Sequence, residues 1–159
     1  MTYDQYQARF YATVPLLPLP IDTVVGLPLF ASAVPTVWHF KWEIEFKSDG
    51  HYIYCREAWS ARKAKPARRY KFSFHYGPGP QRDANGGIII DPKIPVVLRC
   101  DQTSHTPEHI HYLGPDHYEQ DRVQGLVIDK IDLFQFVWAV LRHRSTKDPL
   151  DKILGFKVA

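Results

Sequence analysis

The chain has 159 residues, of which 45% are hydrophobic and 23% are charged. This is the size of one ordinary domain, and the composition excludes a disordered polyelectrolyte. The formal net charge of +3 is too small to indicate a partner by itself, and two cysteines cannot build a disulfide framework. Aromatic residues make up 14% of the chain and 13 residues are proline. Together these values favour a small β-rich domain in the reducing cytoplasm.

The first 35 residues are rich in proline and largely apolar, with Asp22 as the one charged residue between Thr13 and Val34. Lipid could not replace the helix hydrogen bonds that the prolines remove, so we expect no membrane span here. The stretch also lacks the basic cluster and the unbroken apolar run of a signal peptide. We expect residues 1–35 to form an extended arm that packs on the core or on a second copy of the chain, in a homo-oligomer.

The body is predicted to be a single domain, residues 36–159, that begins with a β-hairpin. Every second residue from Trp38 to Phe46 is apolar, which is typical of a half-buried strand. Asp49–Gly50 can form a tight turn, and residues 51–59 are the predicted return strand. A third strand is predicted over Arg68–Tyr76. Its predicted polar face carries Arg69, Lys71, Ser73 and His75.

A helix is predicted near the end of the chain, with Asp132 as its N-cap. Its apolar residues recur at helical spacing: Leu133, Phe136, Val137, Val140 and Leu141. Asp116 with Glu119 is a weaker signal for a short helix, and residues 88–90 and 96–100 are predicted to be further strand pieces. The predicted fold class is α+β: a small antiparallel β-sheet with one or two helices packed on a face, preceded by the proline-rich N-terminal arm.

Positive charge is concentrated in residues 56–71, which hold seven basic residues and a single acidic residue, Glu57. Such a concentration suits phosphate contacts, and the nearby tyrosine and tryptophan side chains could stack on bases. The plain alternative is a solvated loop between two strands. The predicted nucleic-acid-binding residues are Arg56, Arg62, Lys63, Lys65, Arg68, Arg69 and Lys71.

A second cluster, between residues 99 and 111, has more specific chemistry and leaves three interpretations open. The pair His109 and His111, with His105 or Asp101, could bind a metal ion. Alternatively, two histidines could exchange protons with RNA without a metal ion or other cofactor, while Arg99, Arg69 or Lys71 balances the charge at phosphorus. The histidines could also be purely structural. Phosphate-loop, zincin and serine-hydrolase motifs do not occur in the sequence.

Several short segments follow one another in a recognisable order: Glu57, Arg69–Tyr76, Leu98–Gln102, His105–Pro107 and His109–His111. In this order they resemble the TumE-type toxins of prokaryotic toxin–antitoxin modules, over about residues 38–142. Cys100 and Gln102 stand where that family has an aromatic residue and an asparagine. The resemblance implies a small toxin that meets a DNA-binding antitoxin and acts on RNA.

The leading hypothesis is therefore a cytoplasmic, toxin-like ribonuclease or RNA-binding toxin. In this hypothesis His109 and His111, helped by His75 or His105, transfer protons. Arg99 contacts the phosphate and Asp101 orients a histidine. The expected partners are RNA and a cognate helix-turn-helix antitoxin. Two alternatives remain: a non-enzymatic module that binds nucleic acid or protein, and a metal-binding protein that uses the histidine cluster. The predicted catalytic residues are His109, His111, His105, His75, Arg99 and Asp101.

Overall fold

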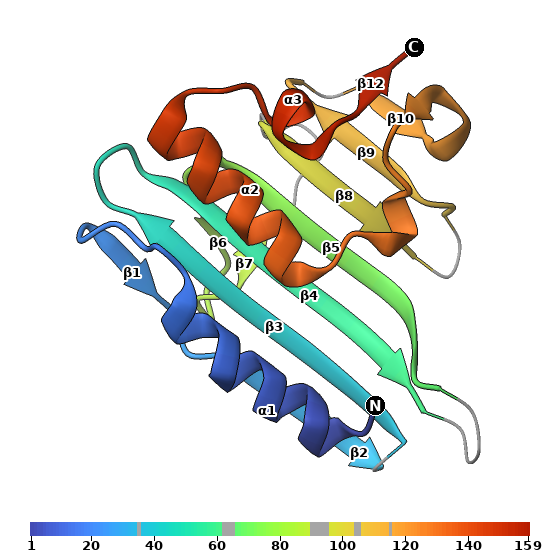
Figure 1. Ribbon diagram of the computed structural model, residues 1–159. Coiled ribbons are helices and arrows are strands. Elements are labelled where there is room, and N and C mark those ends of the chain that lie inside the picture. Colours follow the sequence, from blue (N-terminus) through green and yellow to red (C-terminus); the bar gives the residue numbers. More distant parts are fainter. Residues whose placement is uncertain (35, 62–65, 90–95, 104–105, 115) are drawn as a thin grey trace.

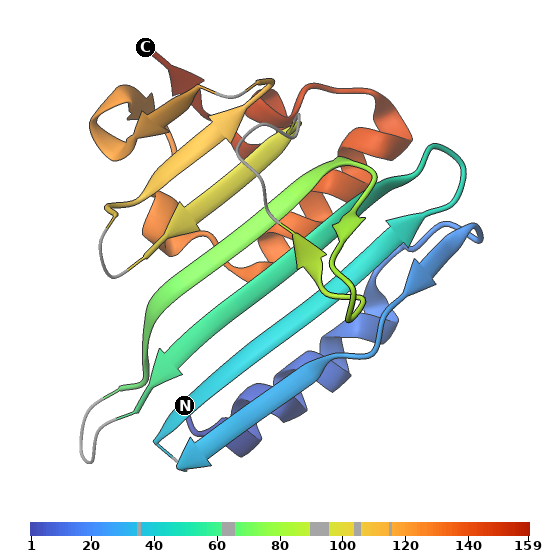
Figure 2. The same ribbon diagram turned by 180° about the vertical axis from the view of Figure 1, so that it is seen from behind.

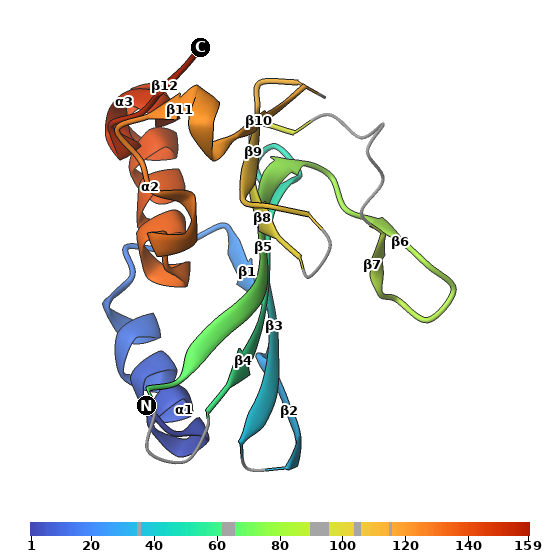
Figure 3. The same cartoon turned by 90° about the vertical axis from the view of Figure 1, so that its right-hand side faces the viewer.

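A computed structural model describes residues 1–34, 36–61, 66–89, 96–103, 106–114 and 116–159. One large sheet forms the middle of the molecule, and the helices lie on one of its faces (Figures 1 and 3). We call this the helix face, and we call the opposite one the open face. The protein has the predicted α+β class with a mainly antiparallel sheet. In the part of the chain described, no helix is long and apolar enough to cross a membrane.

The large sheet has eight strands in the order β1-β3-β4-β5-β8-β9-β10, and β2 also pairs with β3. All of these pairs are antiparallel. The strands are β1 (Thr23–Val25), β2 (Leu29–Val34), β3 (Val37–Phe46), β4 (His51–Ser60), β5 (Arg68–Pro78), β8 (Leu98–Gln102), β9 (His109–Tyr112) and β10 (His117–Glu119). Two small sheets pair β6 (Gln81–Arg82) with β7 (Ile88–Ile89) and β11 (Val123–Gln124) with β12 (Lys157–Val158).

The chain also contains three α-helices and three 3-10 turns within the described residues. The α-helices are α1 (Tyr3–Thr13), α2 (Leu133–Thr146) and α3 (Leu150–Leu154). The 3-10 turns cover Val14–Leu16, Gln120–Arg122 and Ile128–Lys130. Figure 1 shows α1 and α2 crossing the same face of the sheet, α1 over the β3 side and α2 over the middle.

The predicted hairpin is confirmed as β3 and β4, which pair over their full lengths. Gly50 has a φ of 71°, a left-handed conformation that suits glycine in the turn. The apolar residues of β3, from Trp38 to Phe46, are all buried beneath the helices, while His39 and Lys41 between them are exposed on the open face. The alternating pattern therefore assigns both faces of β3 correctly.

The predicted C-terminal helix is confirmed as α2. Asp132 is its N-cap, and the Oδ1 atom of Asp132 accepts a hydrogen bond of 2.7 Å from the backbone N–H of Gln135. Phe136 packs against Phe74 of β5, with ring centroids 5.6 Å apart. All of the residues predicted for the apolar face are buried: Leu133, Phe136, Val137, Val140 and Leu141.

The N-terminal segment differs from the extended arm that its prolines suggested. Residues 3–13 precede the first proline and form the helix α1, which begins with a capping box between Thr2 and Gln5. Phe10 packs against Phe40 and Trp42, with centroid separations of 5.1 and 4.9 Å. The helix α1 therefore contributes side chains to the core. The strands β1 and β2, which follow it, pair with β3 and extend the sheet at that edge.

The short helix suggested by Asp116 and Glu119 is not present. His117–Glu119 is instead strand β10, which pairs with β9, and only the turn Gln120–Arg122 is helical, in the 3-10 form. Pairing with an exposed sheet edge outweighs a weak local cap signal, because it satisfies the backbone groups of three successive residues. This difference matters for function, since it brings His117 onto the sheet.

Among the described residues, no helix lies on the open face. The hairpin β6–β7 crosses it, as Figure 2 shows from behind, and an ion pair of 3.2 Å between Arg82 and Glu43 connects the hairpin to β3. The remaining surface of the open face is formed by side chains of the strands themselves. Several of these side chains belong to the histidine cluster predicted from the sequence.

Candidate active site on the open face

Strand pairing brings five of the six predicted catalytic residues into two adjacent rows across the sheet: His75, Arg99, Asp101, His109 and His111. In one row, Asp101 of β8 lies between Ser73 of β5 and His109 of β9. In the other, Arg99 lies between His75 and His111, and His117 of β10 continues beyond His111. Paired residues point to the same face of an antiparallel sheet, so residues that are far apart in the sequence meet on the open face.

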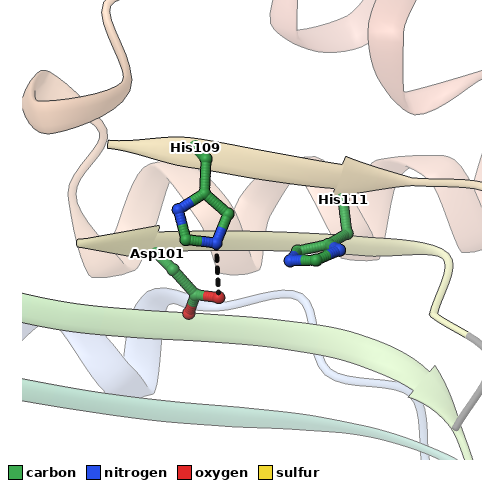
Figure 4. A group of neighbouring side chains, drawn as sticks. All are labelled: Asp101, His109 and His111. Carbon is green, nitrogen blue, oxygen red and sulfur yellow. Dashed lines mark ion pairs between the residues drawn. The ribbon is translucent and has the colours of Figure 1, made fainter. Parts of the chain in front are cut away.

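Asp101, His109 and His111 form the centre of this cluster (Figure 4). Each residue offers one atom that could bind a metal ion, a ring nitrogen or a carboxylate oxygen. These three atoms all lie within 4.8 Å of one another. The Nε2 atom of His109 is 3.6 Å from Oδ2 of Asp101, and its Nδ1 atom is 3.0 Å from the carbonyl oxygen of Pro107. These two contacts fix the orientation of the His109 ring, so the predicted orienting role of Asp101 has a specific partner.

Arg99 contributes the positive charge of the cluster. Its Nε atom is 2.5 Å from Oδ2 of Asp101, and its side chain is 18% exposed, which leaves part of the guanidinium accessible. Arg99 and Asp101 form an ion pair, and neither carboxylate oxygen of Asp101 accepts a hydrogen bond of good geometry from the described residues. Arg99 thus lies beside the imidazoles, at a position where it can meet an anion bound on the open face.

His75 is buried more deeply than the other histidines of the cluster. Burial, assisted by Arg99 and His111, lowers its pKa to about 4, so the ring is neutral near neutral pH. It packs against Tyr52 with centroids 5.0 Å apart, and neither ring nitrogen has a hydrogen-bond partner in the described chain. His75 is thus a neutral imidazole at the inner wall of the site, and we assign it no proton-transfer step.

Buried polar atoms without a hydrogen-bond partner gather around this cluster. They belong to the side chains of Arg56, Ser73, His75, Arg99 and Asp101 within the described residues. Buried polar groups are normally paired, and a bound ligand, ion or water is the usual partner when the protein supplies none. These polar groups are therefore candidates for contact with a ligand on the open face.

His117 is a member of the cluster that the sequence did not reveal. Its ring centroid is 5.5 Å from that of His109 and 5.9 Å from that of His111, and the residue is exposed. It lies outside the dense segment of residues 99–111, and it joins the site only because β10 pairs with β9. His105, which the sequence also placed here, is outside the described residues.

The predicted nucleic-acid-binding residues do not share one surface. Arg56 and Lys71 lie on the open face. Arg56 of β4 pairs with Ser73 of β5, and Lys71 of β5 pairs with Ala58 of β4. Lys41 of β3 pairs with Arg56 on the other side of β4. Lys41 is exposed and was not predicted, although it alternates with the buried residues of its strand. The positions Arg62, Lys63 and Lys65 fall outside the described residues.

Arg69 lies on the helix face, not on the predicted polar face of its strand. The pairing between β4 and β5 shifts at a bulge, where Ala58 faces Lys71 and Trp59 faces Arg69. This bulge reverses the alternation, so Arg69 points toward the helices. Its guanidinium stacks on Phe72 at 4.0 Å and forms a 3.0 Å ion pair with the buried Glu57.

Glu57 and Arg69 border a separate cleft of about 480 Å³ on the helix face. Tyr6 of α1 donates a hydrogen bond of 2.5 Å to Glu57, and Arg69 donates to the other carboxylate oxygen. Arg68 is exposed and lines the same cleft. The buried carboxylate of this cleft is fully paired, so we attribute this network to stability.

Comparison with known proteins adds nothing to this geometry: no protein-family model, curated protein or solved structure matches the chain. The functional assignment therefore depends on the side chains gathered on the open face.

Proposed function

We propose that the protein cleaves RNA at the histidine cluster of the open face. The observation that carries this proposal is the grouping of Arg99, His111 and His117 in one cross-strand row beside Asp101 and His109. Cleavage of a ribose phosphodiester needs a group that accepts a proton, a group that donates one, and a positive charge near the phosphate. The open face supplies all three within neighbouring strands.

In the proposed reaction, the ribose 2′-oxygen attacks the adjacent phosphorus atom and the bond from phosphorus to the 5′-oxygen breaks. One imidazole accepts the 2′-hydroxyl proton, and a second imidazole donates a proton to the leaving 5′-oxygen. The products are a 2′,3′-cyclic phosphate and a free 5′-hydroxyl group. Each bond that forms is balanced by one that breaks, and no further reactant is consumed.

We assign the two proton transfers to His111 and His117, because their rings are more accessible than that of His109. Arg99 is assigned to the phosphate, where its partly exposed guanidinium balances the charge that grows at phosphorus. His109 and Asp101 are positioning residues, since they are buried and contact each other and the neighbouring groups.

The proposed path for the rest of the RNA crosses the strands next to the cluster. Lys41, Arg56 and Lys71 place positive charge on the same face, and the buried Nε atom of Arg56 has no hydrogen-bond partner among the described residues. Phosphate contacts of this kind provide affinity and position the strand without reading its sequence.

The resemblance to TumE-type toxins suggests the cellular setting, which we include in the proposal. The protein would act on cytoplasmic RNA, and a helix-turn-helix antitoxin encoded beside it would neutralise it. The protein would also self-associate through its N-terminal segment. The reason is that this segment exposes four large apolar side chains, those of Leu16, Ile21, Leu27 and Leu29. A mass measurement in solution tests this part, because a monomer that stays monomeric at high concentration would refute it.

The proposal is tested by incubating the purified protein with an oligoribonucleotide and with DNA of the same sequence. We expect RNA products that end in a 2′,3′-cyclic phosphate, and we expect intact DNA, because DNA lacks the attacking hydroxyl group. Binding of RNA that weakens with salt but yields no product would refute cleavage and favour a non-enzymatic binding module. Equal cleavage of RNA and DNA would refute the proposed nucleophile.

A further inference from the structure

We propose that Asp101, His109 and His111 bind one divalent transition-metal ion, for which Zn²⁺ is the probe. The inference concerns the same cluster as the proposed function and rests on that function only where it predicts an effect on cleavage. Metal binding itself is inferred from the positions of three ligand atoms, one on each residue, which all lie within 4.8 Å of one another. Figure 4 shows the three side chains converging from two neighbouring strands.

The backbone holds the three candidate ligands in fixed relative positions. His109 and His111 are two residues apart on β9, so both rings point to the open face. Asp101 lies directly opposite His109 on β8 in the antiparallel ladder. Ligands that project from paired strands need little rearrangement to close around an ion, because the hydrogen-bonded ladder fixes their Cα positions.

The orientation of His109 is that of a metal ligand. A carbonyl oxygen can only accept, so the Nδ1 atom that faces Pro107 at 3.0 Å carries the ring proton. In the neutral ring the Nε2 atom then presents its lone pair toward the carboxylate of Asp101. A backbone carbonyl that fixes the tautomer in this way is a common second partner of metal-binding histidines.

The separation between His109 and Asp101 also suits an ion between them. Their Nε2 and Oδ2 atoms are 3.6 Å apart, which is longer than an ordinary hydrogen bond. Two ligands at about 2.0–2.2 Å from a tetrahedral zinc ion are about 3.3–3.6 Å apart, so the observed separation already lies at the long end of this range. A shared cation would also relieve the repulsion between the lone pair and the carboxylate.

The carboxylate of Asp101 lacks the donors that normally accompany a buried charge. Its side chain is 2% exposed, and neither oxygen has a hydrogen-bond partner among the described residues. Arg99 provides one electrostatic contact, through Nε. A buried carboxylate ordinarily needs several donors or a metal ion, and a metal ion here would complete the set.

The chemistry of the ligands selects the class of ion. Two imidazoles and one carboxylate suit Zn²⁺ and related first-row ions, whereas Mg²⁺ and Ca²⁺ prefer an all-oxygen set. Three protein ligands leave a fourth position for water or substrate, as in catalytic zinc sites. His117 lies near these ligands, with its ring centroid 5.9 Å from that of His111.

Occupancy by an ion would change one assignment in the proposed cleavage. His111 would become a ligand, and a metal-held hydroxide would accept the first proton in its place and become water. His117 would remain the proton donor and Arg99 would remain beside the phosphate. Chelation is therefore expected to change the rate of cleavage and to return the first proton transfer to His111. Metal binding itself is measured without any RNA.

The test is a titration of the protein, first stripped with a chelator, with Zn²⁺ in competition with a coloured chelator. We expect one ion per chain, and we expect Asp101→Asn and His109→Ala each to weaken binding by at least tenfold. Arg99→Met should tighten binding several-fold, because it removes a positive charge next to the ligands. His39→Ala is the matched control, since His39 is an exposed histidine on the same face, away from the cluster.

Three outcomes would overturn the metal site. They are no stoichiometric binding to the wild-type protein, binding that survives both ligand substitutions, and an equal loss in the His39→Ala control. The wild-type titration alone decides the first outcome if a variant fails to fold. The visible spectrum of bound Co²⁺ supplies a second readout, because imidazole ligation gives bands that an ion on the surface lacks. Failure to cleave RNA would instead refute the proposed function and leave the metal titration standing.

Discussion

Replacing Arg69 with methionine should strongly destabilise the protein. Methionine keeps an unbranched apolar chain next to Phe72, on which the guanidinium now stacks. The change removes the group that faces the Glu57 carboxylate at 3.0 Å. It also removes two hydrogen bonds to backbone carbonyls, those of Asp129 and Ile131, which connect the segment before α2 to the sheet.

The expected loss in the free energy of unfolding is about 3–5 kcal/mol, the usual effect of removing one partner of a buried ion pair. The side chains of Glu57 and Arg69 are 3% and 8% exposed, so solvent does not screen the carboxylate that remains. Tyr6 still donates its hydrogen bond to Glu57, which favours the lower part of this range.

The loss should also depend on pH. Burial raises the pKa of Glu57, and Arg69 and Tyr6 oppose that effect. Between the ordinary carboxyl pKa of about 4.3 and the raised value, the folded protein binds more protons than the unfolded chain, so stability falls as pH rises. Without Arg69 the pKa of Glu57 rises further. The substitution should therefore destabilise more near neutral pH than at about pH 5.

Urea unfolding followed by tryptophan fluorescence, at both pH values, measures these effects. Arg68→Met is the matched control, since Arg68 is its exposed neighbour in the sequence and should change stability by less than about 0.5 kcal/mol. The double variant Glu57→Gln/Arg69→Met should lose the extra pH dependence. An Arg69→Met loss below about 1 kcal/mol, or an equal loss at both pH values, would refute the role assigned to this pair.

Three further predictions follow from the packing and the charge of the sheet. Phe10→Ala should lower the free energy of unfolding by about 3–5 kcal/mol in a urea melt, and a loss below about 1 kcal/mol would contradict the docking of α1. Asp132→Ala should lower it by about 0.5–2 kcal/mol through loss of the α2 cap, with no change expected for Asp129→Ala, whose carboxylate caps no helix here. Lys41→Gln and Arg56→Gln should each reduce the slope of log K for RNA against log salt by about 0.7, and unchanged slopes would remove them from the RNA path.

The elements with a strong local pattern could be predicted from the sequence. The β3–β4 hairpin follows from strict alternation and one turn, and α2 follows from apolar spacing and Asp132. The helix α1 carried a signal as well, because Thr2 and Gln5 form its capping box. That signal was missed because residues 1–35 were treated as one segment. The prolines, which begin only at Pro15, favoured an extended conformation for all of it.

Features that depend on long-range pairing could not be predicted in this way. The bulge at Ala58 and Trp59 turns Arg69 to the helix face, because a single extra residue reverses the alternation of a strand. The place of His117 depends on the pairing of β10 with β9, which no local pattern shows. The sequence predicted that Asp101 and His109 belong to one dense functional segment. That they lie directly opposite each other follows only from the register of β8 and β9.

The most direct test of the central claim is the rate of RNA cleavage by the wild-type protein and by the double variant His111→Ala/His117→Ala, with His39→Ala as the control. If the cluster performs the reaction, the double variant should cleave at least about a hundredfold more slowly, while the control keeps the wild-type rate. Equal rates for all three proteins, each shown to be folded, would contradict the assignment of RNA cleavage to the open face.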